Sequence, residues 1–215
     1  DPEMSRGLGD VYKRQIRKRF CGEKENKMRK IVSLFSLLLI SACLSRTPDA
    51  SFYGLQALAA EAPLSDRKIS VGVNRAVIPS YLEKPQIVLV GSDGVELQVS
   101  EYHRWGESLA SLLQRITADD LNLLLPRAEI KPQNFTAQIY DYYLTLEVNR
   151  MDGTWNKQAV LDVWWTVTDS RNKVLKRERT SLSAPLGKTY EDYAQVQSRL
   201  LGELSARIAA VLAKI

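Results

Sequence analysis

The chain contains few of the residues that carry out catalysis or bind metals. Its 215 residues include one histidine, His103, and two cysteines, Cys21 and Cys43. A Ser-His-Asp or Cys-His set would have to use His103, and no nucleophile is indicated within its reach. The alternative is a structural histidine beside Arg104 and Trp105, where a strand gives way to a helix. Because clusters of cysteine and histidine are also missing, we expect a protein that is not an enzyme, with no catalytic residue and no metal site.

Adjacent carboxylates occur at Asp119-Asp120 and at Glu191-Asp192. Both pairs fall on predicted helices, where neighbouring side chains point about 100° apart and do not converge on one substrate atom. Solvated helix faces or helix caps explain these pairs better, and their spacing is not that of a calcium loop. We expect no bound cofactor.

The chain also lacks a basic surface that its overall charge suggests. The net charge is +5, but residues 1–42 hold ten of the 30 Lys and Arg residues and five of the 25 Asp and Glu residues. Residues 43–215 therefore carry 20 of each sign and are formally neutral. This balance argues against a nucleic-acid partner.

One apolar run, Ile31–Ala42, is too short to span a membrane as a helix, which takes about 20 residues. Its length and the preceding Met28-Arg29-Lys30 are typical of a secretory signal. The run ends in Ile40-Ser41-Ala42-Cys43, which resembles the bacterial lipobox, so Cys43 is predicted to carry a diacylglyceryl group. The alternative is an ordinary secretory signal with a chance cysteine. Two or more acyl chains are needed for stable membrane attachment.

The sequence divides into four predicted parts. Residues 1–27 are polar, lack apolar periodicity and are interpreted as a non-native or artefactual segment, with a cytoplasmic extension from Met4 as the alternative. Residues 28–42 are the predicted lipoprotein signal peptide and 43–51 a lipidated tether. Residues 52–215 are predicted to form one domain without an intrachain disulfide, because Cys43 is the only cysteine after the leader.

The pattern of apolar residues predicts an α+β domain, a mainly antiparallel or mixed sheet packed by two amphipathic helices at about 105–125 and 190–213. Asp120 interrupts the apolar face of the first helix, and Thr189 with Asp192 resembles a capping box of the second. The predicted strands are Phe52–Leu58, Lys68–Pro79, a hairpin of Gln86–Val90 and Val95–Val99, and a three-stranded meander from about 137 to 183.

Trp164 and Trp165 are adjacent in the middle strand of this meander, so their rings face opposite sides. Trp165 shares the apolar face of Leu161, Val163 and Val167. Trp164 then faces outward beside Val160 and Asp162, either toward a partner or beneath a second packed layer, and the sequence leaves both open.

The stretch Val77–Pro126 resembles the ABC-type transport auxiliary lipoproteins, the PqiC-like family. Its first motif is a Pro-x-Tyr-Leu segment that runs into Pro-Gln-Ile-Val, and its second is an Arg-Trp pair that opens a helix. The resemblance extends over about 52–215, with Gly106 and Ser108 as small departures. The motif residues are Tyr81, Leu82, Pro85, Gln86, Ile87, Arg104 and Trp105. They are candidate partner-binding residues, with core packing of Tyr81 and Trp105 as the alternative.

The resemblance implies a periplasmic subunit of an intermembrane lipid transport system in a Gram-negative bacterium. Its partners would be an MCE-domain transport protein and an inner-membrane permease, and a ring-like homo-oligomer is conceivable. Leu44 stands where an Asp commonly retains lipoproteins in the inner membrane, which favours anchoring on the periplasmic side of the outer membrane. Alternatives are a lipoprotein that scaffolds or activates cell-wall synthesis and a direct periplasmic lipid carrier.

Overall fold

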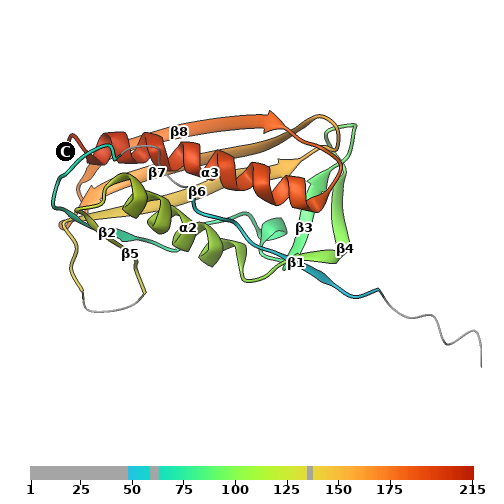
Figure 1. The fold of residues 1–215 in the computed structure, drawn as a ribbon, viewed down its shortest axis with the longest axis horizontal. Coiled ribbons are helices and arrows are strands. Elements are labelled where there is room, and N and C mark those ends of the chain that lie inside the picture. The colour runs from blue at the N-terminus through green and yellow to red at the C-terminus, as the bar shows by residue number, and fades with distance from the viewer. Residues whose placement is uncertain (1–47, 59–62, 135–137) are drawn as a thin grey trace, which may run out of the picture. The chain divides into compact units, whose positions relative to one another are not determined.

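The described part of the chain, residues 48–58, 63–134 and 138–215 of a computed structural model, contains two β-sheets and two long helices (Figure 1). Asp49–Ile215 form one compact unit. The α+β class is therefore confirmed, although the chain builds two sheets rather than the one that was predicted. The predicted leader, the signal peptide and Cys43 lie outside the described residues.

The larger sheet has five strands in the order β5-β2-β6-β7-β8. Its long half is an antiparallel meander of β6 (Tyr142–Gly153), β7 (Gln158–Asp169) and β8 (Val174–Pro185). The shorter strands β2 (Ser70–Val73) and β5 (Glu129–Pro132) continue the sheet in parallel pairing. The meander was predicted correctly, because its inward side chains alternate with polar ones at the period of a strand.

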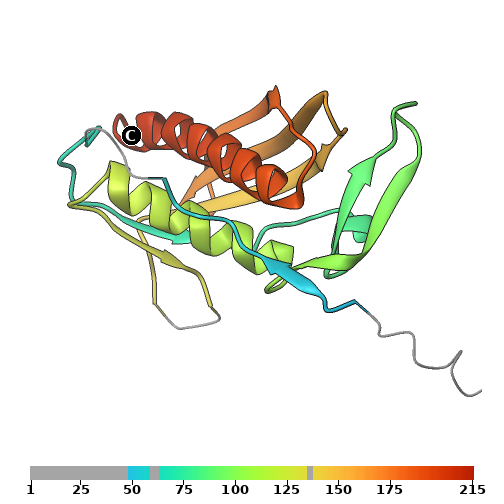
Figure 2. The same cartoon turned by 45° about the vertical axis from the view of Figure 1, so that its right-hand side comes forward.

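The smaller sheet has three strands in the order β1-β4-β3. The predicted hairpin is confirmed: β3 (Gln86–Val90) pairs antiparallel with β4 (Leu97–Trp105). Strand β4 continues well past Val99, where the sequence pattern ended, because β1 (Ser51–Tyr53) pairs with its last three residues in parallel. In Figure 2 the green β3–β4 hairpin of this sheet stands at one end of the unit.

Helix α2 (Leu109–Leu124) and helix α3 (Tyr190–Leu212) pack against one another over one face of the five-stranded sheet (Figure 1). Both predicted helices are confirmed. The Thr189 side chain accepts the Asp192 backbone N–H at the start of α3, and Ser108 caps α2 in the same way. The predicted stripe of α3 is buried at these positions: Tyr193, Val196, Leu200, Leu204 and Ile208.

Two predicted strands are wrong in length. The strand expected over Phe52–Leu58 ends at Tyr53, because the next backbone N–H groups bond to helix side chains and not to a neighbouring strand. Residues 54–58, which we call the strap, run over the seam between α2 and α3. The strand expected over Lys68–Pro79 ends at Val73, after which the chain contacts β6 through hydrogen bonds of Asn74 and an isolated bridge at Val77.

Asp120 corrects the prediction that the adjacent carboxylates are solvated. Its relative exposure is 2 %, and it occupies the buried face of α2 where an apolar residue was expected. The carboxylate accepts the backbone N–H of Leu58 at 2.8 Å and the hydroxyl of Ser205 at 3.1 Å. It thus joins α2, α3 and the strap. Burial raises the pKa of Asp120 to about 6, although the bond from Leu58 and the bond from Ser205 both act to lower it.

Asp120→Asn should remove this burial penalty at neutral pH. Because the folded-state pKa is raised above the unfolded one, the carboxyl contributes stability below the unfolded pKa and loses it as the pH rises through about 6. A shift from 3.8 to about 6 corresponds to at most about 3 kcal/mol. Urea unfolding at about pH 4 and at about pH 7 provides the measurement. The free energy of unfolding of the variant, relative to that of the wild type, should be higher at about pH 7 than at about pH 4.

The exposed neighbour provides the control for this measurement. Asp119→Asn removes a carboxylate one residue away on the solvent side of α2. Its charge is the last of the causes that raise the pKa of Asp120, and it lies 3.7 Å from the exposed Arg115, so the pH dependence of its effect should be much smaller than that of Asp120→Asn. A stability difference between Asp120→Asn and wild type that does not change with pH would contradict the assignment.

Candidate functional site

The seven motif residues come together where β3 begins and β4 ends, and we call this region the motif corner. Tyr81 and Leu82 lie in the 3-10 turn η1 (Ser80–Leu82), directly before Pro85 and β3. The Trp105 backbone N–H donates to the Pro85 carbonyl at 2.7 Å. Gln86 pairs with Arg104 across the hairpin. Because Pro85 holds Lys84 out of the helical region, the corner has one fixed entry into β3.

Part of the motif corner belongs to the core. Trp105 is 4 % exposed, and its ring lies 6.0 Å from that of Tyr193 in helix α3. Leu82 and Ile87 are buried as well. Tyr81 is half-buried against the core, and its pKa is raised, first by burial and then by the nearby Asp152. These residues fix the smaller sheet onto the rest of the unit.

Arg104 differs from the other motif residues. It is half-buried, and its Nε is buried with no hydrogen-bond partner. Among the ion pairs formed by the described residues, none includes Arg104. A guanidinium without a carboxylate is available for an external anion or acceptor. Sequence reasoning selected this residue only through the resemblance, because pairing depends on side chains far away in the chain.

His103 lies in an aromatic cluster that the sequence did not predict. Its Nδ1 is 2.7 Å from the Tyr53 hydroxyl, and its ring stacks on Tyr190 at 3.8 Å. Trp155 meets Tyr190 edge-on. Burial raises the pKa of Tyr53, as does the adjacent Glu191 carboxylate. A raised pKa keeps the phenol neutral, so this cluster joins β1, β4 and α3 and does not supply an activated nucleophile.

The face of the large sheet opposite the helices carries charged pairs. Asp162 is nearly buried and receives two hydrogen bonds from Arg179, the shorter at 2.6 Å, which lowers the pKa of Asp162. The Arg177 guanidinium lies over the Trp164 ring at 5.2 Å from its centroid. Trp164 is therefore half-buried beneath an arginine, while Trp165 is buried in the core as expected.

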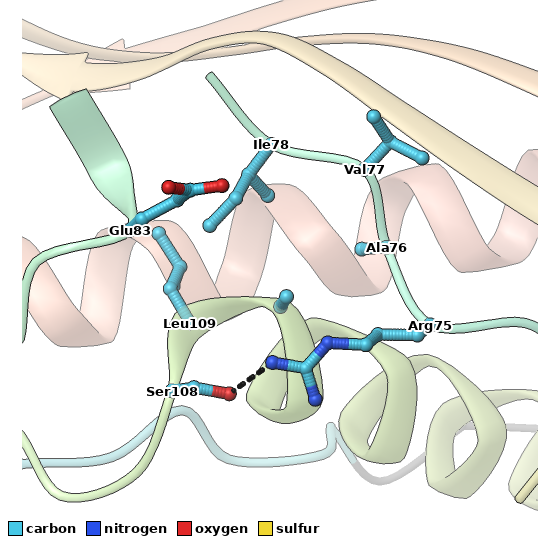
Figure 3. Close-up of a pocket in the computed structure, with 8 residues that line it drawn as sticks. Arg75, Ala76, Val77, Ile78, Glu83, Ser108 and Leu109 are labelled. Atoms are coloured by element: carbon cyan, nitrogen blue, oxygen red, sulfur yellow. Dashed lines mark hydrogen bonds between the residues drawn. The ribbon is translucent and has the colours of Figure 1, made fainter. Parts of the chain in front are cut away.

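Arg75 follows β2 and lies beside the start of α2, and a cavity lies on either side of its side chain. The first, of about 270 Å³, lies between the segment after β2 and the first turn of α2, with Ile78 and Leu109 on its wall and Glu83 at its rim (Figure 3). The second has a volume of about 320 Å³. The Arg75 guanidinium donates to the hydroxyls of Ser108 and Ser111 at 2.9 and 2.6 Å. Both volumes are at the lower limit for small-molecule pockets, and a diacyl lipid needs more room than either provides.

Within the described ranges, no group of three or more His, Cys, Asp and Glu side chains is placed to hold a metal ion. No helix among the described residues is both long and apolar enough to cross a membrane.

The family model of the ABC-type transport auxiliary lipoprotein component matches residues 53–209. The chain belongs to this family. The match includes the whole motif corner, helix α2 and most of α3, and it confirms the resemblance found in the sequence. The protein is therefore a member of a family of transport auxiliary lipoproteins. The search of curated proteins found no match.

Solved structures confirm the fold. The crystal structure of an uncharacterized protein is 21 % identical, with a TM-score of 0.64, and the alignment covers 77 % of this chain and 99 % of that one. A protein of the DUF330 family from Xanthomonas campestris is 14 % identical, with a TM-score of 0.63 and coverage of 76 % and 95 %. The PelC dodecamer of Paraburkholderia phytofirmans has a TM-score of 0.40, with 17 % identity and coverage of 78 % and 95 %. A TM-score this low carries no argument about the present chain.

Substitutions in the motif corner should separate its buried structural residues from the half-buried Arg104. Trp105→Ala removes a buried ring from the contact between the smaller sheet and helix α3, so the free energy of unfolding should fall by about 3–5 kcal/mol. Arg104→Gln breaks no ion pair among the described residues, so it should cost about 1 kcal/mol or less. Urea unfolding of both variants is the measurement, and a large loss in Arg104→Gln would show that this residue is structural.

Proposed function

We propose that the protein is an outer-membrane lipoprotein that acts as a periplasmic docking subunit of an MCE-type lipid transport system. The family match over residues 53–209 carries this proposal, because it assigns the folded unit to transport auxiliary lipoproteins. The lipobox-like Ile40–Cys43 supports anchoring through an acylated Cys43. Leu44 after that cysteine supports outer-membrane sorting.

The geometry supports docking rather than catalysis or enclosed transport. His103 and Tyr53 are joined in an aromatic cluster, and the cavities beside Arg75 are too small for a diacyl lipid. The unit is instead rigidly assembled, with each half of the motif corner tied to the other by backbone bonds. A folded unit of this kind would contribute to transport by holding its position between the membrane and a partner protein.

The proposed partners are an MCE-domain protein and its inner-membrane permease. The lipoprotein would hold the outer-membrane end of a conduit whose other end is the permease. A ring of several copies would suit a tubular partner. Net neutrality after Cys43 makes non-specific electrostatic attachment a weak alternative to such a specific complex.

Cys43→Ala should release the protein from membranes. Without the thiol no diacylglyceryl group can be added, and no apolar run of membrane-spanning length remains. Fractionation of a Gram-negative host, followed by mass measurement of the processed chain, provides the test. Cys21→Ala is the matched control, since Cys21 precedes the predicted signal and should not affect retention. Retention of Cys43→Ala in the membrane fraction would contradict the anchor.

Affinity purification from gently solubilised membranes should recover an MCE-domain protein together with its permease. The expected result is a complex that survives size-exclusion chromatography and contains both partners. Recovery of a murein synthase in their place would overturn the transport assignment and favour the alternative role in cell-wall synthesis.

A further inference from the structure

Strands β1 and β4 of the smaller sheet carry apolar side chains that the rest of the described chain leaves exposed. Residues paired across a sheet point to the same side. Gln86, Val88 and Val90 alternate along β3, so the register places Phe52 and Arg104 on their face, across an irregularity in β4 between Val99 and Arg104. Val88 and Val90 are themselves buried, so the exposed part of this face belongs to β1 and β4. On that face Val88 pairs with Val99 and Val90 with Leu97. Three side chains of the face are large, apolar and exposed: Phe52 at 65 %, Leu97 at 47 % and Val99 at 49 %.

These three side chains and Arg104 form what we call the β4 patch. It combines apolar side chains with one cation that has no ion-pair partner among the described residues. Arginine and aromatic side chains are well suited to the boundary between headgroups and acyl chains. The acidic residues Asp93 and Glu96 lie beyond Leu97 at the hairpin tip and mark the end of the patch.

The short chain between the predicted lipid on Cys43 and the β4 patch favours the membrane as the surface that covers this patch. Seven residues lie between Cys43 and Ser51, the first residue of β1, so eight Cα–Cα steps join the two. Even fully extended they span no more than about 29 Å, so an acylated Cys43 keeps Phe52 close to the bilayer. Strand β1 pairs directly with the end of β4 that carries Arg104. The smaller sheet is thus the part of the unit that the tether holds nearest to the membrane.

We propose that the β4 patch rests on the lipid surface, with Phe52, Leu97 and Val99 in the interfacial region and Arg104 on a lipid phosphate. The inference rests on the proposed anchor at Cys43 and adds an orientation to it. Arg104, predicted as a partner-binding residue, then contacts lipid. The faces of the unit away from β4 remain available to a protein partner.

The hairpin has the rigidity that such a contact requires. Its tip is held by the Lys157 ammonium, which donates to the Ser92 carbonyl at 3.0 Å, and by Asp93, which accepts two backbone N–H groups of the turn. Its base is fixed by the motif corner. The patch therefore reaches the membrane as a preformed surface and loses little conformational entropy there.

The test uses a chain from residue 43 with Cys43→Ser and an amino-terminal hexahistidine tag, attached to vesicles through a nickel-chelating lipid. This chain has no other cysteine, so Val99→Cys introduces one site for an environment-sensitive fluorophore. On vesicles of phosphatidylethanolamine and phosphatidylglycerol the emission should shift to shorter wavelength and be quenched by nitroxides on the acyl chains. Val174→Cys, an exposed valine on β8, is the matched control and should show neither effect.

Arg104→Gln should lower the ratio of quenched to unquenched protein about fivefold on these anionic vesicles, since one cation near such a surface contributes about 1 kcal/mol. Equal signals at positions 99 and 174 would overturn the proposal. A blue shift at position 99 without vesicles that depends on protein concentration would also overturn it, because a second copy would then cover the patch. The tag replaces the lipid, so absence of acylation at Cys43 would refute the anchor without affecting this result.

Discussion

The apolar face of the long meander is the surface on which the other layers depend. Trp165, at its centre, is buried on the side that helix α3 covers, and its indole N–H donates to the Thr180 hydroxyl at 3.0 Å. The aromatic ring buries a large apolar area while its polar atom stays satisfied. Helix α2 then packs beside α3, and the strap closes the seam between them. The smaller sheet packs against this assembly through the ring of Trp105, which lies beside that of Tyr193 in α3.

Prediction from the sequence was most accurate where one face of an element contacts one layer. Strand β7 lies within the predicted meander, and α3 lies where the second amphipathic helix was predicted, because periodicity reports a single buried side. It failed at residues 54–58 and after Val73, where the chain is extended but bonds to a helix or to an irregular neighbour. Asp120 was misjudged because three separate elements create its buried site.

The candidate site was only partly accessible to sequence reasoning. The resemblance selected all seven residues of the motif corner, and the fold brings them together. Their roles could not be read in advance, since the burial of Trp105 depends on Tyr193, which is 88 positions away in the chain. The aromatic cluster of Tyr53, His103 and Tyr190 likewise joins three distant segments. Long-range contacts of this kind leave no periodic pattern behind.

The strap has a mechanical consequence. Any tension on the amino-terminal chain enters through β1, whose parallel pairing with β4 places several bonds under load together, including Gly106 N–H to the Tyr53 carbonyl at 2.8 Å. A load transmitted beyond β1 would act on Leu58 in the strap. The Leu58 side chain packs so closely on Gly202 that a methyl group at position 202 would overlap it. A pull is thus spread across both helices and is not concentrated on one hydrogen bond. The unit is built to bear traction at its amino terminus.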